Sequence, residues 1–260
     1  MRSRLTSFSL AALACLLWAA TGPAEARAQS ITLSPAVIPL TGSAGQSVTQ
    51  VLTLQNDSDL PLAFELEARD VVVRDGARVF VEAGVLPDSI AASAVFTPRE
   101  LRLGARSRAT VTVTLTLPAG VRHRAAVALF RGTTPVPSGD RQALLSLGSL
   151  FTFTLSDRVS IAAGALEAEP PSASANARLG STLVNDGAEP VVPAGMAVIL
   201  DAGGRLVGKA PFAARRLLPG ERTTLVADYA GDLGAGTYRA VATFDYAGRA
   251  LTLTGSLVVP

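Results

Sequence analysis

A short pattern occurs twice in this chain and constrains its fold more than any other feature. Residues 53–57 read TLQND and residues 182–186 read TLVND, each an alternating apolar run that ends in an Asn-Asp turn. The similarity continues downstream, where LRLGARSR at 101–108 is matched by RLLPGER at 216–222. Each segment leads into another alternating stretch, which is typical of a β-strand that follows a tight turn. The repeat predicts one β-sandwich plan used twice.

The first residues have the organisation of a secretory signal peptide. Arg2 and Arg4 provide the positive region, residues 9–22 provide the apolar stretch, and Ala-Arg-Ala at 26–28 offers a cleavage site. We therefore expect a signal peptide over residues 1–28. A signal of this kind predicts a periplasmic or secreted mature protein.

The only cysteine of the chain, Cys15, lies inside this signal. It would serve a lipoprotein if residues 12–14 formed a lipid-attachment box, but their Ala-Leu-Ala sequence is a poor one and the apolar run continues to Trp18. The mature chain then contains no thiol. It must be stabilised by burial of a core, for which about 230 residues in two domains suffice.

The mature chain is expected to be electrically neutral. The full sequence has a net charge of +2, and residues 1–28 hold three arginines against one glutamate, which accounts for all of it. A neutral surface argues against nucleic acid as a partner. No second long apolar run follows the signal, so we also expect no transmembrane anchor.

The mature sequence predicts an all-β protein of two tandem immunoglobulin-like β-sandwich domains. Helical periodicity is nearly absent, whereas the apolar residues of 111–117 alternate with threonine in a period of two. Pro35 and Pro39 remove hydrogen-bond donors from the first strand, which is therefore an edge strand or changes sheets midway. The Leu-x-x-Gly-x-Tyr spacing at 233–238 is that of a tyrosine corner, a marker of this fold.

Composition also suggests where the two domains meet. Residues 157–176 are rich in Ala, Glu, Pro and Ser and include Pro170-Pro171, so we interpret them as a linker. The first immunoglobulin-like sandwich then spans residues 29–156, and the second spans residues 177–260.

Candidate catalytic and metal-binding residues are few. His123 is the only histidine and lies between two arginines, with no nucleophile or orienting acid indicated by spacing, so we expect a solvated loop residue. A single histidine and no mature cysteine leave zinc unsupported. The polar run at 56–59 could collect a calcium ion, but a turn already explains it. We expect no enzymatic activity, no metal and no cofactor.

The strongest candidate for binding is a long alternating strand near the end of the first domain, which follows the loop at 132–141. In β-strand addition, the backbone of an edge strand binds a partner while alternate side chains fill pockets. The alternative is that this row is ordinary core, which we favour for Phe151, Phe153 and Leu155. The predicted partner-binding residues are Leu145, Leu147, Ser149, Phe151 and Phe153.

The first domain resembles the N-terminal immunoglobulin-like domain of periplasmic pilus-assembly chaperones. The matching segments are ITLSP at 31–35, LQNDS at 54–58, FTP at 96–98 ahead of LGARS at 103–107, and the alternating strand at 145–155. The resemblance covers about half of the mature chain. It implies binding of pilus subunits by β-strand addition.

One property of that family has no counterpart here. Its members anchor the carboxylate of the subunit with a basic residue on the first strand and a lysine on the long donor strand. Residues 31–40 and 144–156 contain no basic residue, and Arg158 is the first positive charge beyond them. The domain is also similar to sandwich domains of Gram-positive surface proteins.

These observations predict an exported, non-enzymatic protein-binding protein. The first hypothesis is a periplasmic chaperone for pilus or surface subunits that uses the strand described above. The alternative is a structural or adhesive module of the cell envelope, with an envelope component as its partner.

Overall fold

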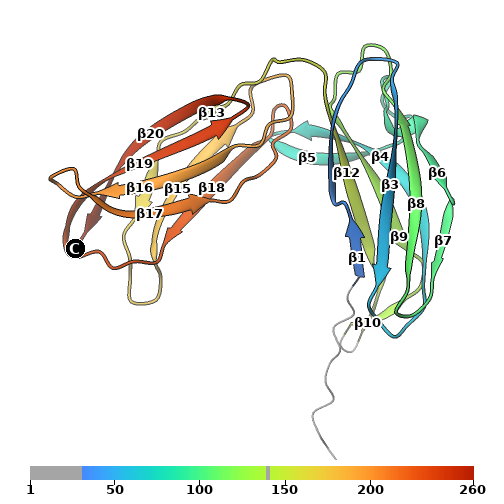
Figure 1. The fold of residues 1–260 in the computed structure, drawn as a ribbon, viewed down its shortest axis with the longest axis horizontal. Helices are drawn as coiled ribbons and strands as arrows, with labels where there is room; N and C mark the ends of the chain where they lie inside the picture. Colours follow the sequence, from blue (N-terminus) through green and yellow to red (C-terminus); the bar gives the residue numbers. More distant parts are fainter. Residues whose placement is uncertain (1–30, 139–140) are drawn as a thin grey trace, which may run out of the picture.

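The computed structural model describes residues 31–138 and 141–260, and it is built almost entirely of β-strands (Figure 1). The predicted signal peptide, residues 1–28, lies outside the described residues. Two elongated sandwiches meet at one end and diverge from there. The all-β fold of two tandem sandwiches is confirmed.

The first domain consists of two sheets that face each other. One sheet has the order β1-β3-β8-β6, and the other has the order β2-β12-β9-β4-β5, with β7 paired to the remaining part of β4. A small hairpin, β10-β11, extends the loop before β12. The elements are β1 (Ile31–Ser34), β2 (Val37–Thr41), β3 (Ser47–Asn56), β4 (Leu62–Arg74), β5 (Ala77–Glu82), the 3₁₀ turn η1 (Ala91–Ser93), β6 (Val95–Thr97), β7 (Glu100–Leu103), β8 (Arg108–Thr116), β9 (Ala125–Gly132), β10 (Val136–Ser138), β11 (Arg141–Ala143) and β12 (Ser146–Thr154).

The first strand changes sheets, which confirms one of the two outcomes predicted from its prolines. β1 pairs antiparallel with β3, whereas β2 pairs parallel with β12 in the opposite sheet. Pro35 lies between the two halves. Because proline has no N–H to donate to a ladder, the chain can leave the first sheet there without losing a hydrogen bond.

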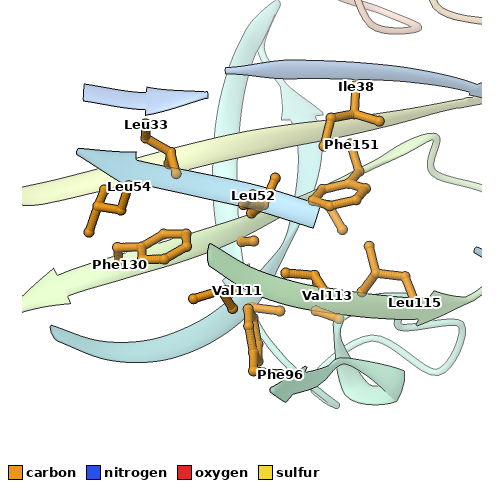
Figure 2. Packing of buried hydrophobic residues seen from close by; sticks show 14 of the residues in the cluster. Leu33, Ile38, Leu52, Leu54, Phe96, Val111, Val113, Leu115, Phe130 and Phe151 are labelled. Carbon is orange, nitrogen blue, oxygen red and sulfur yellow. The ribbon is translucent and has the colours of Figure 1, made fainter. Parts of the chain in front are cut away.

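Alternating side chains of both sheets fill the space between them (Figure 2). The predicted alternation in β8 is confirmed, since Val111, Val113 and Leu115 are buried. They contact the same apolar cluster as Phe130 and Phe151 from the other sheet. Each such side chain contributes roughly 1.5–3 kcal/mol through the removal of its surface from water.

The second domain repeats the plan with two four-stranded sheets. One contains β13, β14, β15 and β18, and the other has the order β17-β16-β19-β20. Phe212 and Phe244 contact each other in its core, with ring centroids 4.7 Å apart. The elements are β13 (Ala162–Ala163), β14 (Glu167–Glu169), β15 (Ala177–Val184), β16 (Ala194–Leu200), β17 (Leu206–Phe212), β18 (Arg222–Tyr229), β19 (Gly236–Tyr246) and β20 (Arg249–Val259).

The segment expected to be a linker contributes to this second domain. Residues 157–176 contain β13 and β14, and both pair antiparallel with β15. β13 and β14 have only two and three residues, which is too short for a periodic pattern in the sequence to predict them. This stretch is therefore an edge of the second sandwich over part of its length, while the domain bounds themselves stay a prediction.

The repeated Asn-Asp turns have the same hydrogen bonds in both domains. The Asn56 side-chain amide donates to the carbonyls of Leu60 and Gly104, at 2.7 and 2.9 Å. In the second domain the Asn185 amide donates to the carbonyls of Glu189 and Leu217, at 2.8 and 3.0 Å. Each asparagine side chain thus joins its own turn to the second repeated segment of the same domain, residues 101–108 or residues 216–222. This contact explains why the two segments recur together.

The predicted tyrosine corner is also confirmed. The Tyr238 hydroxyl donates to the carbonyl of Gly234 at 2.8 Å, the backward bond that defines this motif.

Candidate functional site

β12 is the element on which the sequence placed the partner-binding residues. On one side it pairs antiparallel with β9 over residues 146–152. On the other side β2 pairs only with residues 150–154. Among the described residues, no strand pairs with the outer edge of residues 146–148, so the first third of β12 is an open sheet edge.

Backbone groups at this open edge alternate in direction. The N–H of Leu150 donates to Ala36 on the outer side, whereas the N–H of Phe153 donates to Arg124 on the β9 side. By the two-residue period of a strand, Ser146 and Gly148 also direct their N–H and C=O groups outward. These groups can pair with an added strand.

The predicted side chains separate into two groups. Phe151 and Phe153 are fully buried in the first core, and Ser149 is buried with its hydroxyl donating to the carbonyl of Pro35 at 2.6 Å. Leu145 and Leu147 are only half-buried, and they lie at the margin of the core. The burial of Phe151 and Phe153 agrees with the expectation that they belong to the core. The alternating face of β12 points between the sheets, only its first part approaches the surface, and partner binding by the five residues stays a prediction.

Glycines allow the chain to approach itself closely at the start of β12. Gly132, at the end of β9, donates its N–H to the carbonyl of Leu145 at 2.6 Å. A Cβ at residue 132 would overlap with that carbonyl. In front of this contact, Leu144 is 61% exposed. The start of β12 is thus held against β9 on one side, and the exposed Leu144 precedes the open edge on the other.

An apolar strip covers the outer face of the same sheet and turns toward the second domain. Val71, Ala125 and Val127 are buried there beneath Leu218 of the second domain. Leu150 of β12 continues the strip with partial exposure. A cavity of about 260 Å³ lies at this junction, lined by residues 71–73, residues 122–124, Leu218 and Pro219.

Two ion pairs connect the domains, one buried and one partly exposed. Arg124 donates to Glu189 at 3.0 Å, and their side chains are 9% and 0% exposed. Arg78 donates to Glu221 at 2.9 Å and to the carbonyl of Arg216. Charges buried in pairs are costly to separate, so these contacts favour one relative orientation of the two sandwiches.

His123 is buried, which corrects the expectation of a solvated loop residue. Its Nε2 lies 2.9 Å from Asp70 Oδ1, and its Nδ1 lies 3.7 Å from Asp88 Oδ2. The two flanking arginines led to the expectation of exposure. The partner of His123, Asp70, is 53 residues away in the sequence, so no local spacing could indicate that these two side chains meet. The hydroxyl of Ser89 also donates to Asp70.

The two carboxylates around His123 have lowered pKa values. Burial of Asp70 opposes its ionisation, but hydrogen bonds from His123, Ser89 and the Ala91 N–H outweigh burial and hold the pKa below its ordinary value. At Asp88, burial is likewise outweighed, by backbone N–H groups including that of Arg122 and by the charges of His123 and Arg122, so its pKa is lowered.

This cluster differs from a serine hydrolase triad. In a triad the imidazole lies between the serine hydroxyl and the carboxylate. Here Asp70 lies between Ser89 and His123, so the imidazole does not receive the hydroxyl proton. The arrangement stabilises the loop that carries Arg124.

Within residues 31–138 and 141–260, no group of three or more His, Cys, Asp or Glu side chains is placed to hold a metal ion. The same part of the chain has no helix long and apolar enough to span a membrane.

Comparison with known proteins gives a likeness of fold. No protein-family model matches the chain, and neither does any curated protein sequence. Among solved structures, the class 5 fimbrial chaperone CfaA is 13% identical, with a TM-score of 0.45 over 89% of this chain and 100% of CfaA.

Two further structures are similar to the same extent. DraB, a chaperone from E. coli, is 18% identical, with a TM-score of 0.41 over 88% of this chain and 98% of its own. A structure of the Salmonella enterica SafA pilin in complex with the SafB chaperone matches at 15% identity and a TM-score of 0.41. That match covers 88% of this chain and 97% of the other. The predicted resemblance to pilus-assembly chaperones is therefore found at the level of the fold.

Proposed function

We propose that this protein is an exported, non-enzymatic chaperone that binds an extended segment of a pilus or surface subunit along β12. The observation that carries the proposal is the open edge of residues 146–148, where β2 no longer pairs with β12. A segment of the subunit would add there as a strand next to β12, on the side that β2 leaves free.

An unpaired edge of this kind favours association with another strand, because its N–H and C=O groups have no intramolecular partners. Backbone hydrogen bonds then give affinity, and neighbouring apolar side chains give specificity. Leu144 and the half-buried Leu145 and Leu147 supply those side chains. The buried Ser149, Phe151 and Phe153 would support the strand from inside.

The apolar strip on the outer face of the same sheet extends this surface. Val37 is 43% exposed next to Leu150, its register partner on β2. A bound segment that continues past β12 would therefore meet apolar side chains, and the two ion pairs between the domains would hold the second domain at a fixed distance from it.

A structural or adhesive envelope module is the second candidate. It is favoured by the burial of three of the five predicted side chains and by the β10-β11 hairpin, which offers a separate contact surface. In that case the open edge of β12 would not take part in binding.

The test uses a proline at the open edge. Ser146 is exposed and directs its N–H outward, so Ser146→Pro removes a donor that an added strand needs while an edge position tolerates proline. The mature protein, residues 29–260, would be crosslinked mildly in its native periplasm and captured, and bound proteins would be identified by mass spectrometry. We expect a stoichiometric β-rich subunit with the unchanged protein and with the control Ser146→Ala, and at least about tenfold less with Ser146→Pro.

Equal thermal unfolding of the three proteins would show that the proline acts on binding. Capture of the same components by Ser146→Pro, or recovery of envelope components alone, would refute the chaperone proposal and favour the structural module.

A further inference from the structure

A second surface lies on the first domain, on the far side of β9 from β12, where the edge of β4 is interrupted. β7 pairs with β4 over residues 62–65, and β5 pairs with it over residues 69–74. Residues 66–68 have no register partner on this edge. The gap is about 10 Å long, at 3.3 Å for each residue of a strand.

A cavity of about 600 Å³ opens at this gap. Its volume lies within the range of sites that bind small ligands and short peptides. Ala83, just after β5, lines one end, and Arg99, just before β7, lines the other. The cavity therefore coincides with the interruption in the ladder.

The inner wall of the cavity is formed by small side chains. Ala68 of β4 faces the core, and the wall also includes two alanines of η1 and Ala94, which follows η1. Phe96 closes the wall behind them. Such a wall offers an apolar surface against which an apolar side chain can pack.

The outer rim is charged, with an excess of cations. Glu67 forms ion pairs with both Arg69 and Arg131, at 3.0 and 3.4 Å, so one carboxylate is shared by two guanidinium groups. Arg99 is exposed and forms no ion pair with a described residue. With Glu82, the rim contains three arginines and two glutamates. An anionic ligand is favoured, and a guanidinium group matches a carboxylate in both charge and geometry.

Backbone groups also face the gap. Ala63 directs its N–H and C=O toward the β9 side, where they contact Thr134 and Thr133. By the two-residue period, Leu66 and Ala68 direct theirs toward the gap. These groups match the donors and acceptors of a peptide backbone better than those of a lipid.

We propose that this cavity binds the carboxyl terminus of a peptide. β5 and β7 close the gap at both ends, so a strand cannot pass through it and an incoming chain must end there. The excess of cations selects a carboxyl over an amino terminus, and the alanine wall favours an apolar last residue. Arg99 pairs with the terminal carboxylate, and Leu66 and Ala68 bond with the preceding backbone.

The test is a titration of the mature protein with an acetylated tetra-alanine peptide, followed by isothermal calorimetry and backbone NMR. We expect saturable binding with shifts at residues 66–68, and at least about tenfold weaker affinity for the C-terminal amide of the same peptide. Arg99→Glu should weaken binding to a similar extent. Ala92→Phe, a change at an exposed position that fills the cavity, should abolish it.

The matched control is Arg102→Glu, which changes an exposed arginine of β7 outside the cavity and should leave the affinity unchanged. Equal binding of the amide, or unchanged affinity in Arg99→Glu and Ala92→Phe, would overturn the proposal. Ser146→Pro is expected to leave this binding intact, so the two proposals can fail independently.

Discussion

At the scale of single residues, a few buried polar groups determine the geometry of the molecule. Asn56 and Asn185 tie paired loops together in the two domains, and Asp70 joins His123 to Ser89. All of them are in the interior, where an unpaired polar group costs free energy. Removal of a single partner should therefore have a large effect on stability.

Asn185→Ala should lower the free energy of unfolding by about 2–4 kcal/mol, because the carbonyls of Glu189 and Leu217 and the N–H of Gly187 lose their partner. Urea denaturation measures this change. Asp186→Ala, at the exposed neighbouring position, is the control and should change stability by less than about 0.5 kcal/mol. If Asn185→Ala also changed stability by less than about 0.5 kcal/mol, the repeated turn would not be a stabilising element.

Asp70 should make the free energy of unfolding depend on pH. Its pKa in the folded state is lowered, so it contributes stability above its unfolded pKa of about 3.9, and that contribution is lost as the pH falls through the folded value. We expect Asp70→Asn to be less stable at pH 7 and to lose less stability than the unchanged protein below about pH 4. Thermal unfolding from pH 7 to pH 2 measures both slopes, and parallel slopes would contradict the assignment.

At the scale of elements, alternation and turn residues predict much of the fold. The period of two in β8, the Asn turns and the prolines of the first strand indicate strands, turns and a change of sheet, and the structure confirms them. Two features could not be predicted from the sequence, because each depends on contacts with another strand. The pairing of β13 and β14 depends on β15, and the open edge of β12 depends on the length of β2.

The same distinction applies to the candidate site. Alternation correctly indicates that Leu145, Leu147, Phe151 and Phe153 share one face, but it does not tell which part of that face is covered. Burial of His123 was not predictable either, because its partner Asp70 is distant in the sequence. The interrupted edge of β4 was also missed, since it arises where two other strands end.

At the scale of the whole molecule, the two sandwiches are connected by a small apolar contact and two ion pairs, of which Arg124–Glu189 is buried. A junction that depends on a few charges is sensitive to the loss of any one of them. The relative orientation of the domains should therefore respond to single substitutions.

Arg124→Leu should lower the free energy of unfolding by about 3–5 kcal/mol, because the carboxylate of Glu189 stays buried without its cation. The double variant Arg124→Leu with Glu189→Gln should recover part of that loss. Small-angle X-ray scattering should show a broader distribution of domain separations in the single variant. An unchanged scattering curve together with unchanged stability would mean that this ion pair does not orient the domains. Arg122→Leu, at an arginine that is 82% exposed, is the control.

The carboxylate of Glu189 also affects the timing of assembly. It accepts hydrogen bonds from the Leu155 N–H and from the hydroxyl of Ser156, 33 residues earlier, directly after β12. Because Glu189 follows the whole amino-terminal sandwich in the sequence, these two hydrogen bonds at the end of β12 cannot form until the second domain is in place. The first domain is therefore completed by the second, and the two sandwiches are coupled in folding as well as in orientation.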